Sequence, residues 1–254
     1  MKNLMNITDL TVEEIDELIA VAEDIIANPV KYQDCCRHKL LATLFFEPST
    51  RTRLSFESAM HRLGGSVVGF SEAGSSSSAK GESLSDTVQT VGCYADLIVM
   101  RHPKEGAPVV AARRAGVPII NAGDGAHAHP SQGLLDMFTL REKGLKDLKG
   151  KKMVILGDIL YSRVARTNIA AWNKMGADVH VAGPRPLMPY AVESLGVTYH
   201  KRIEEAIEGA DVIDVLRIQL ERQKSGLFPS PREYARIFGL NEARLKLAKP
   251  DCVV

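Results

Sequence analysis

The sequence lacks several features that would place it in a common functional class, and each absence narrows what the chain can do. Its 32 Lys and Arg residues nearly balance 31 Asp and Glu residues, so the net charge of +1 gives no overall field for nucleic acid or an anionic membrane. No apolar run approaches the ~18 residues of a membrane span, and the N-terminus lacks the apolar core of a signal peptide. We therefore expect a soluble, unprocessed protein that binds anions only through local groups.

The chain is also poor in cysteine patterns. Its 4 cysteines, Cys35, Cys36, Cys93 and Cys252, show neither C-x-x-C spacing nor a neighbouring histidine cluster. The adjacent pair cannot easily bridge to each other, because disulfide geometry does not suit neighbours in the chain. This pattern predicts reduced thiols and a cytoplasmic location.

What the sequence does contain is an alternation of strand and helix patterns. Its 254 residues and 45% hydrophobic content suffice for one large or two modest domains. The expected strands lie at 40–46, 67–70, 97–100, 117–120, 153–156, 178–182 and 210–215. A basic, glycine-punctuated junction after Lys143 predicts a boundary between domains 1–143 and 144–254. We expect an α/β protein with two doubly wound parallel sheets and an active site between the two domains.

Two cofactor classes are disfavoured by particular residues. The βαβ pattern over 153–182 lacks G-x-G-x-x-G, and its second strand runs into Gly183-Pro184-Arg185 with no acidic residue for a ribose. A nicotinamide cofactor is therefore not expected. His127 and His129 near Asp124 could suggest a metal, but the remaining ligands are missing from the pattern.

The stretch from Phe45 to Glu57 has the chemistry of an anion site. The apolar run 40–46 predicts a buried strand, and Ser49 or Thr50 can cap a helix whose core face is Phe56, Ala59, Met60 and Leu63. The first turn of a helix favours acidic residues, yet this one carries Arg51 and Arg53. Free N–H groups, hydroxyls and guanidinium groups together predict a phosphate site. The alternative is a capped helix whose arginines pair with surface carboxylates.

Other candidate residues follow predicted strands or lie in polar segments. Arg101 and His129 lie beyond strands, where ligands gather in parallel sheets, although each could be an ordinary surface or loop residue. Lys80 lies in the serine-rich segment 71–82, where composition favours a solvated linker and predicts a mobile loop. Arg163 lies near the start of a predicted helix, and Arg166 is expected on its solvated face.

These residues occur in strings that resemble a known family. The strings are Ser49-Thr50-Arg51-Thr52-Arg53, Ser77-Ser78-Ala79-Lys80-Gly81-Glu82, Met100-Arg101-His102-Pro103, His129-Pro130-Ser131-Gln132, Gly157-Asp158-x-x-Tyr161-Ser162-Arg163 and Arg217-x-Gln219-x-Glu221-Arg222. Together, and in this order, they resemble the aspartate and ornithine carbamoyltransferases, in particular the members that use aspartate. The resemblance implies transfer of a carbamoyl group from carbamoyl phosphate to L-aspartate, giving N-carbamoyl-L-aspartate and phosphate, an early step of de novo pyrimidine biosynthesis.

The resemblance also implies roles for single residues. Carbamoyl phosphate would be bound by Ser49, Thr50, Arg51, Thr52, Arg101, His129 and Gln132, with Arg53 in support. Aspartate would be bound by Lys80, Arg163, Arg217 and Gln219, and the catalytic groups would be Arg51, Thr52, Arg101 and His129. We expect no metal and no organic cofactor, because phosphate itself can accept the amine proton. The family also implies a homotrimer in which Lys80 reaches a neighbour's site, and a possible regulatory chain.

Two alternative functions remain at this point. The acceptor could be ornithine or another amine, although the arginine-rich half of the site argues for a dicarboxylate. The chain could also be a relative that binds carbamoyl phosphate without catalysis. The family pattern continues beyond Val254 into a His-Pro-x-Pro loop and a terminal helix. We therefore expect a C-terminally incomplete second domain that turns over poorly.

Overall fold

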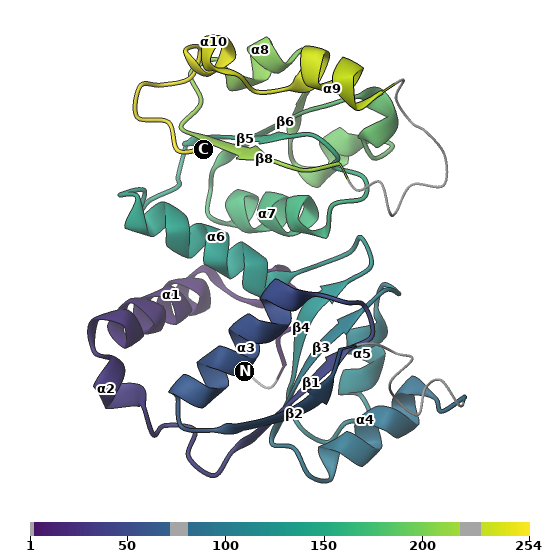
Figure 1. The fold of residues 1–254 in the computed structure, drawn as a ribbon. Helices are drawn as coiled ribbons and strands as arrows, with labels where there is room; N and C mark the ends of the chain where they lie inside the picture. Colours follow the sequence, from purple (N-terminus) through teal and green to yellow (C-terminus); the bar gives the residue numbers. More distant parts are fainter. Residues whose placement is uncertain (1–2, 72–80, 219–229) are drawn as a thin grey trace. The chain divides into compact units, whose positions relative to one another are not determined.

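The computed structural model describes residues 3–71, 81–218 and 230–254. The chain divides into two compact units, Met1–Leu134 and Leu135–Val254, and each unit contains one four-stranded parallel sheet (Figure 1). The division falls within helix α6 (Pro130–Glu142), whereas the boundary predicted from the sequence follows the end of that helix. The expected α/β class is confirmed.

The first unit is built from alternating strands and helices. Its elements are η1 (Ile7–Asp9), α1 (Val12–Ala27), α2 (Pro29–Tyr32), β1 (Leu40–Phe45), α3 (Thr50–Arg62), β2 (Ser66–Phe70), α4 (Leu84–Gly92), β3 (Leu97–His102), α5 (Ala107–Ala112) and β4 (Ile119–Asp124). The strands lie in the order β2-β1-β3-β4, and all neighbouring pairs are parallel. Leu4 adds a single parallel bridge to Ile120 beside β4.

Helices cover both faces of this sheet (Figure 1). On one face, strand residues pack with α4 and α5 in a cluster that includes Ala42, Leu44, Val88, Ile98, Met100, Ala111 and Ile119. On the other face, the intervening strand residues pack with α3 in a cluster of Leu41, Phe45, Met60, Val99 and Ala122. Burial on both faces explains why these strands read as continuous apolar runs in the sequence.

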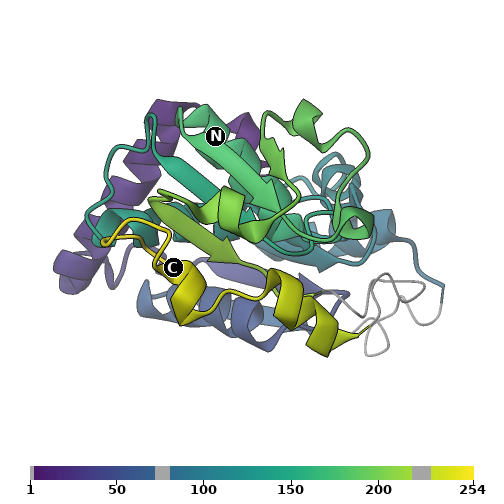
Figure 2. The ribbon, with the colours of Figure 1, turned by 90° about the horizontal axis from the view of Figure 1, so that it is seen from above.

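The second unit repeats the same architecture. Its further elements are β5 (Lys152–Leu156), α7 (Arg163–Lys174), β6 (Asp178–Ala182), η4 (Arg185–Leu187), η5 (Val192–Leu195), β7 (Thr198–His200), α8 (Ile203–Ile207), β8 (Val212–Val215), α9 (Pro231–Phe238) and α10 (Glu242–Leu245). The strand order is β7-β6-β5-β8. Helix α7 covers one face of the sheet and α8 covers the other, and Figure 2 looks onto α9, α10 and the C-terminus.

Each sheet contains one point at which the chain reverses its direction of growth. In the first unit, the chain runs from β1 outward to β2 and then returns to place β3 on the other side of β1. In the second unit, it runs from β5 to β6 and β7 before β8 is added on the other side of β5. Ligands of open parallel sheets bind beyond the carboxyl ends of the strands at such switch points. The topology therefore directs attention to the residues after β1 and β3, and after β5 and β8.

Several local signals behave as the sequence predicts. Thr11 and Glu14 form a reciprocal capping box at the start of α1. Ser230 and Asn241 accept capping hydrogen bonds at the starts of α9 and α10. Near the C-terminus, Val253 makes one parallel bridge to Val212. Among the described residues, none of the helices combines the length and apolarity that crossing a membrane requires.

Other expectations need correction. Strand β4 runs to Asp124, so the polar residues Asn121 and Asp124 belong to the strand and not to the loop beyond it. Ala59, which we placed on the core face of its helix, is exposed. Helical periodicity identifies a face, but only the tertiary structure decides how wide a stripe of that face is covered. The expected mobile loop lies largely outside the described residues.

Candidate active site

The first turn of α3 carries the residues that the sequence identified as an anion site. Ser49 occupies the predicted N-cap position in extended backbone, but its side chain makes no capping hydrogen bond. The turn contains no acidic side chain, Arg51 is exposed, and Thr52 and Arg53 are half-buried. The N–H groups of a helix start point outward with a partial positive charge, and hydroxyls and a guanidinium surround them here. The turn can therefore bind an anion in the way that the sequence predicts.

Arg53 has an internal partner. Its Nε donates to Glu57 Oε1 at 2.7 Å, and Thr43 Oγ1 donates to the same oxygen at 2.9 Å. Thr43 is a fully buried residue of β1, so this carboxylate joins the first turns of α3 to the sheet. The sequence left open that the arginines of this helix pair with surface carboxylates. Arg53 does pair with a carboxylate, but that carboxylate is half-buried and not on the surface.

Arg101 reaches the same edge of the sheet from β3. It lies in register with Phe45, and its backbone oxygen accepts from the N–H of Phe46, so the two strand exits are adjacent. Its Nη2 and Nε donate to Glu47 Oε1 at 2.7 and 3.2 Å. Both side chains are mostly buried, which strengthens their attraction relative to an exposed pair. Glu47 therefore holds Arg101 close to the loop that leads into α3.

The next residue of β3, His102, has a lowered pKa. Its ring lies 5.0 Å from the ring of Phe46, and burial is the main cause that lowers its pKa. Its Nδ1 accepts a hydrogen bond from the backbone N–H of Lys104 at 2.9 Å, which fixes the orientation of the ring. His102 thus packs against Phe46 in an environment that disfavours its charged form.

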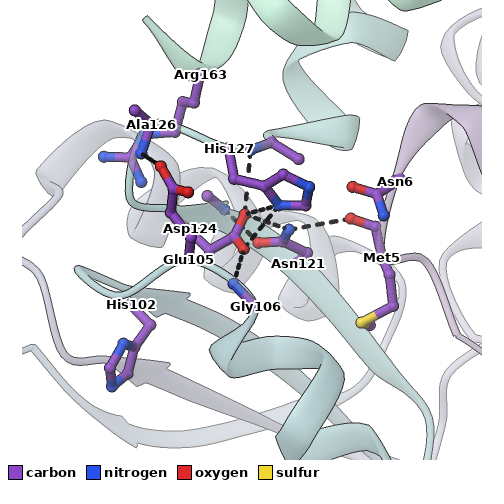
Figure 3. A network of polar contacts seen from close by, with 12 residues as sticks. Met5, Asn6, His102, Glu105, Gly106, Asn121, Asp124, Ala126, His127 and Arg163 are labelled. Atoms are coloured by element: carbon purple, nitrogen blue, oxygen red, sulfur yellow. Dashed lines mark hydrogen bonds and ion pairs between the residues drawn. The ribbon is translucent and has the colours of Figure 1, made fainter. Parts of the chain in front are cut away.

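A buried carboxylate shapes the loop after β4 (Figure 3). Asp124 is fully buried and accepts hydrogen bonds from the backbone N–H groups of Gly106 and Ala128 at 2.7 and 3.1 Å. It also accepts from Asn121 Nδ2 at 2.9 Å and contacts His127 Nδ1 at 3.0 Å. Asp124 therefore organises the backbone of the loop. Within residues 3–71, 81–218 and 230–254, no group of three or more acidic, histidine or cysteine side chains could hold a metal ion.

His129 and Gln132 follow that loop directly. The backbone of Asp124 donates to the oxygen of Ala128, which ends the turn just before His129. His129 is buried, and its Nδ1 lies 3.3 Å from the hydroxyl of Ser131. Gln132 lies in the first turn of α6 and is half-buried. The network around Asp124 thus fixes the position of both candidate residues relative to β4.

In the second unit, the turn after β5 carries Arg163. Asp158 is fully buried and accepts from the backbone N–H of Tyr161 at 3.0 Å, which closes the turn. Ser162 caps α7, so Arg163 is the first residue of that helix, and it is buried. Tyr234 of α9 lies near this turn, and burial, followed by the charge of Asp158, raises its pKa to about 12.

Arg217 follows the neighbouring strand. Leu216 donates from its backbone N–H to the oxygen of Leu156, so the exits of β5 and β8 run side by side. Arg217 is exposed, and its Nη1 lies 3.4 Å from the backbone oxygen of Ile218. Arg163 and Arg217 therefore leave the two strands that flank the second switch point. The expectation for Arg166 was wrong: its Nε is buried and has no hydrogen-bond partner among the described residues.

The structure places candidate residues at both switch points and adds several that the sequence did not identify. Lys80 and Gln219 lie outside the described residues. Glu47 and Glu57 were missed as partners of arginines, although both lie within the same string as Arg51 and could have been paired by spacing. Asp124 was noticed only as a possible metal ligand, because the sequence does not show which backbone N–H groups, among them those of Gly106 and Ala128, donate to its side chain.

Both units of the chain match models of known protein families. The family model described as "Aspartate/ornithine carbamoyltransferase, carbamoyl-P binding domain" matches residues 2–142. The model described as "Aspartate/ornithine carbamoyltransferase, Asp/Orn binding domain" matches residues 149–254. The chain belongs to this family. Within the aspartate/ornithine carbamoyltransferase family, the carbamoyl-phosphate domain corresponds to the unit that contains Arg51 and Arg101.

Individual relatives agree. The aspartate carbamoyltransferase catalytic subunit of Caldanaerobacter subterraneus is 52% identical over 256 residues, which are 100% of this chain and 84% of the relative. Aspartate transcarbamoylase of Trypanosoma cruzi, solved with N-(phosphonacetyl)-L-aspartic acid, matches with a TM-score of 0.84 at 31% identity, over 100% of this chain and 82% of that one. Ornithine carbamoyltransferase of Thermus thermophilus matches with a TM-score of 0.84 at 26% identity, over 99% of this chain and 83% of that one. The fold alone therefore does not distinguish the two acceptors.

Proposed function

We propose that the chain transfers the carbamoyl group of carbamoyl phosphate to the amino group of L-aspartate, giving N-carbamoyl-L-aspartate and phosphate. The observation that carries this proposal is the presence of arginines at both switch points, Arg51 and Arg101 in one unit and Arg163 and Arg217 in the other. A dianionic phosphate and a dicarboxylate amine are the ligands that two such cationic sites suit. The name of the 52% identical relative favours the same acceptor.

The phosphate group is bound at the start of α3. Ser49, Thr50 and Thr52 offer hydroxyls, the helix start offers N–H groups, and Arg51 offers a guanidinium that can grip two oxygens. Arg53 supports this arrangement from its pair with Glu57 and adds positive potential behind the turn. In the reaction, phosphate is the leaving group and gains negative charge as its bond to the carbonyl carbon breaks. The donors at the start of α3 stabilise that charge.

The carbonyl oxygen becomes negative as the amine attacks, and it requires donors. Thr52, Arg101 and His129 supply them, and Gln132 orients the carbamoyl amide. A neutral imidazole that accepts from Ser131 at Nδ1 carries its proton on Nε2 and can donate it to the oxygen. Donors that are fixed before the reaction contribute most, and the loss of one typically costs ~3–4 kcal/mol of transition-state stabilisation.

The acceptor is bound by Arg163 and Arg217, together with Lys80 and Gln219. Two guanidinium groups from adjacent strand exits suit the two carboxylates of aspartate, whereas ornithine would bring a second amine toward the same cations. In the reaction, the deprotonated amine forms a bond to the carbonyl carbon and the bond from that carbon to the phosphate oxygen breaks. The departing phosphate takes up the amine proton, so no metal or organic cofactor is required.

The assembly and location form part of the same proposal. The domains are 1–143 for carbamoyl phosphate and 144–254 for aspartate, and the active form is a cytoplasmic homotrimer in which Lys80 serves a neighbouring subunit's site. A regulatory chain is a possible further partner. The mass of the purified protein by light scattering tests the trimer directly, since a monomer of 27.7 kDa would contradict it.

The test of the reaction is phosphate release from carbamoyl phosphate with L-aspartate, with L-ornithine or with no acceptor. We expect release that depends on aspartate and is accompanied by N-carbamoyl-L-aspartate. Arg51→Ala should abolish it, and the matched control is Arg62→Ala, which changes an exposed arginine in the last turn of the same helix. Preference for ornithine would establish the alternative acceptor. Binding of carbamoyl phosphate without transfer to any amine would establish the non-catalytic alternative.

A further inference from the structure

A single amide joins three elements of the second unit. Asn168 lies on α7 and is almost fully buried. Its Nδ2 donates to Asp136 Oδ2 on α6 at 2.8 Å and to Asp214 Oδ2 on β8 at 3.1 Å. An NH2 group has two hydrogens, so both are used, one for each carboxylate. None of the roles proposed above for residues in the reaction explains why two carboxylates contact one buried amide.

Two of the joined elements lead to the candidate acceptor arginines. Helix α7 begins at Arg163, and Thr167 Oγ1, adjacent to Asn168, donates to the backbone oxygen of Arg163 at 2.9 Å. Strand β8 ends at Val215, and Arg217 follows it directly. A shift of α7 along β8 would therefore move one arginine relative to the other. The hydrogen bond between Asn168 and Asp214 opposes such a shift.

We propose that Asn168 and Asp214 are positioning residues that set the spacing of Arg163 and Arg217 for the two carboxylates of the acceptor. This inference rests on the proposed function and extends it to residues that do not touch substrate. A dicarboxylate whose two ends are bound by two guanidinium groups tolerates little error in their spacing, because misplacement of about 1 Å reduces the rate strongly.

The choice of side chains supports a positioning role. A lysine or arginine at position 168 would place a positive charge between the two carboxylates, whereas asparagine only donates a hydrogen bond to each of them. Burial raises the pKa of Asp214 to about 6, the hydrogen bond from Asn168 opposes that rise, and the charge of Asp136 adds to it. On the paired strand β5, the residue in register is the apolar Ile155. The cations nearest in sequence on these elements are Arg166 on α7 and Arg217 after β8.

This arrangement has a consequence for pH. Above pH 6, ionised Asp214 accepts a charge-assisted hydrogen bond from Asn168, which is about twice as strong as a neutral one. Below pH 6, the protonated carboxyl accepts more weakly and α7 is held less firmly against β8. The KM for aspartate should therefore rise as the pH falls through about 6, whereas the KM for carbamoyl phosphate should not respond to Asp214.

The first experiment compares Asn168→Leu with Asn173→Leu in the full chain. Asn173 lies on the same helix and donates from Nδ2 to the backbone oxygen of Leu195 at 2.8 Å, away from the arginines. We expect Asn168→Leu to raise the KM for aspartate by about tenfold or more, as the loss of a charge-assisted hydrogen bond implies, with kcat changed less. Asn173→Leu should leave both constants within about twofold.

The second experiment uses Asp214→Asn, which keeps an oxygen that can accept from Asn168 but cannot titrate. Because asparagine, like the protonated carboxyl, is a neutral acceptor, we expect the KM for aspartate at pH 8 to match that of the unchanged protein below pH 6 and to show no inflection near pH 6. If the dependence of the aspartate KM on pH is the same in Asp214→Asn as in the unchanged protein, the inference is wrong. An unchanged aspartate KM in Asn168→Leu would also show it to be wrong.

Failure of this inference and failure of the proposed function can be told apart. If the unchanged protein releases no phosphate with aspartate, the function fails, and calorimetric binding of N-(phosphonacetyl)-L-aspartic acid replaces KM as the measurement of the acceptor site. If the protein is active and the variants are normal, only the inference fails. Trp172, the one tryptophan of the chain, lies on α7 and reports by fluorescence whether each variant has folded. Should Asn168→Leu not fold, the profile of Asp214→Asn decides the question.

Discussion

Replacing Asp214 by asparagine should make the second unit more stable at neutral pH. The pKa of this carboxyl rises from 3.8 to about 6 on folding, mainly because of burial. A pKa that is higher in the folded state means that the folded protein binds more protons between pH 4 and 6, so stability falls as the pH rises through that window. Above it, ionised Asp214 costs the folded state up to about 3 kcal/mol. An asparagine in the same place removes this cost and still accepts from Asn168.

We expect Asp214→Asn to raise the free energy of unfolding by about 1–3 kcal/mol at pH 7.5, and by close to zero at pH 4. The lower part of that range applies if water reaches the half-buried carboxyl. The assay is urea unfolding at several pH values, followed by the fluorescence of Trp172, which is buried in the same unit. At each pH we compare the free energy of unfolding of the variant with that of the unchanged protein. The contributions of other titrating groups cancel in this difference, since distant sites contribute additively.

Two results would contradict this reasoning. A stability difference that does not change between pH 4 and 7.5 would show that Asp214 has the same pKa in both states. A variant that is less stable at pH 7.5 would show that the negative charge is compensated by a cation in the folded protein. Asp251→Asn is a suitable control, because Asp251 is an exposed carboxylate of the same unit.

Three further outcomes are expected. Arg51→Ala should reduce aspartate-dependent phosphate release by at least 100-fold, as loss of a transition-state donor does, with an unchanged melting temperature, and Arg62→Ala should be normal. Glu57→Gln should lower the free energy of unfolding by about 1 kcal/mol, because the ion pair with Arg53 within α3 is lost and the hydrogen bond from Thr43 of β1 becomes a neutral one. No change in urea unfolding would show that solvent already screens the charge of Glu57. Mixing Lys80→Ala subunits with His129→Ala subunits should restore activity, and persistent inactivity after verified subunit exchange would place both residues in one subunit's site.

The sequence alone predicted the features that arise from local chemistry. Thr11 and Glu14 satisfy each other across one helical turn, and the apolar run that begins at Leu40 has the length of a buried strand. Such signals need no knowledge of the rest of the chain. The same holds for the strings around Arg51 and Arg163, whose composition is unusual for the start of a helix.

What the sequence did not reveal depends on contacts between distant elements. Asp124 was assigned to a loop because polar residues after an apolar run normally end a strand, but its partners Gly106 and Ala128 satisfy it inside the fold. Arg166 was placed in solvent because periodicity gives no information about what packs beside a helix. Asn168 carried no signal at all, since its role follows from two carboxylates that lie far from it in sequence.

The arrangement of carboxylates also explains how a nearly neutral chain maintains strongly cationic sites. An arginine without a partner near the start of a helix would be repelled by the helix dipole, and it would destabilise the unliganded protein. Glu57 offsets this for Arg53, and Glu47 does so for Arg101 at the neighbouring strand exit. In the proposed reaction, carbamoyl phosphate must take Arg101 from this existing partner, so we expect a measured affinity smaller than the new contacts alone would give. On this proposal, the internal carboxylate affects the binding of the substrate as well as the arginine does.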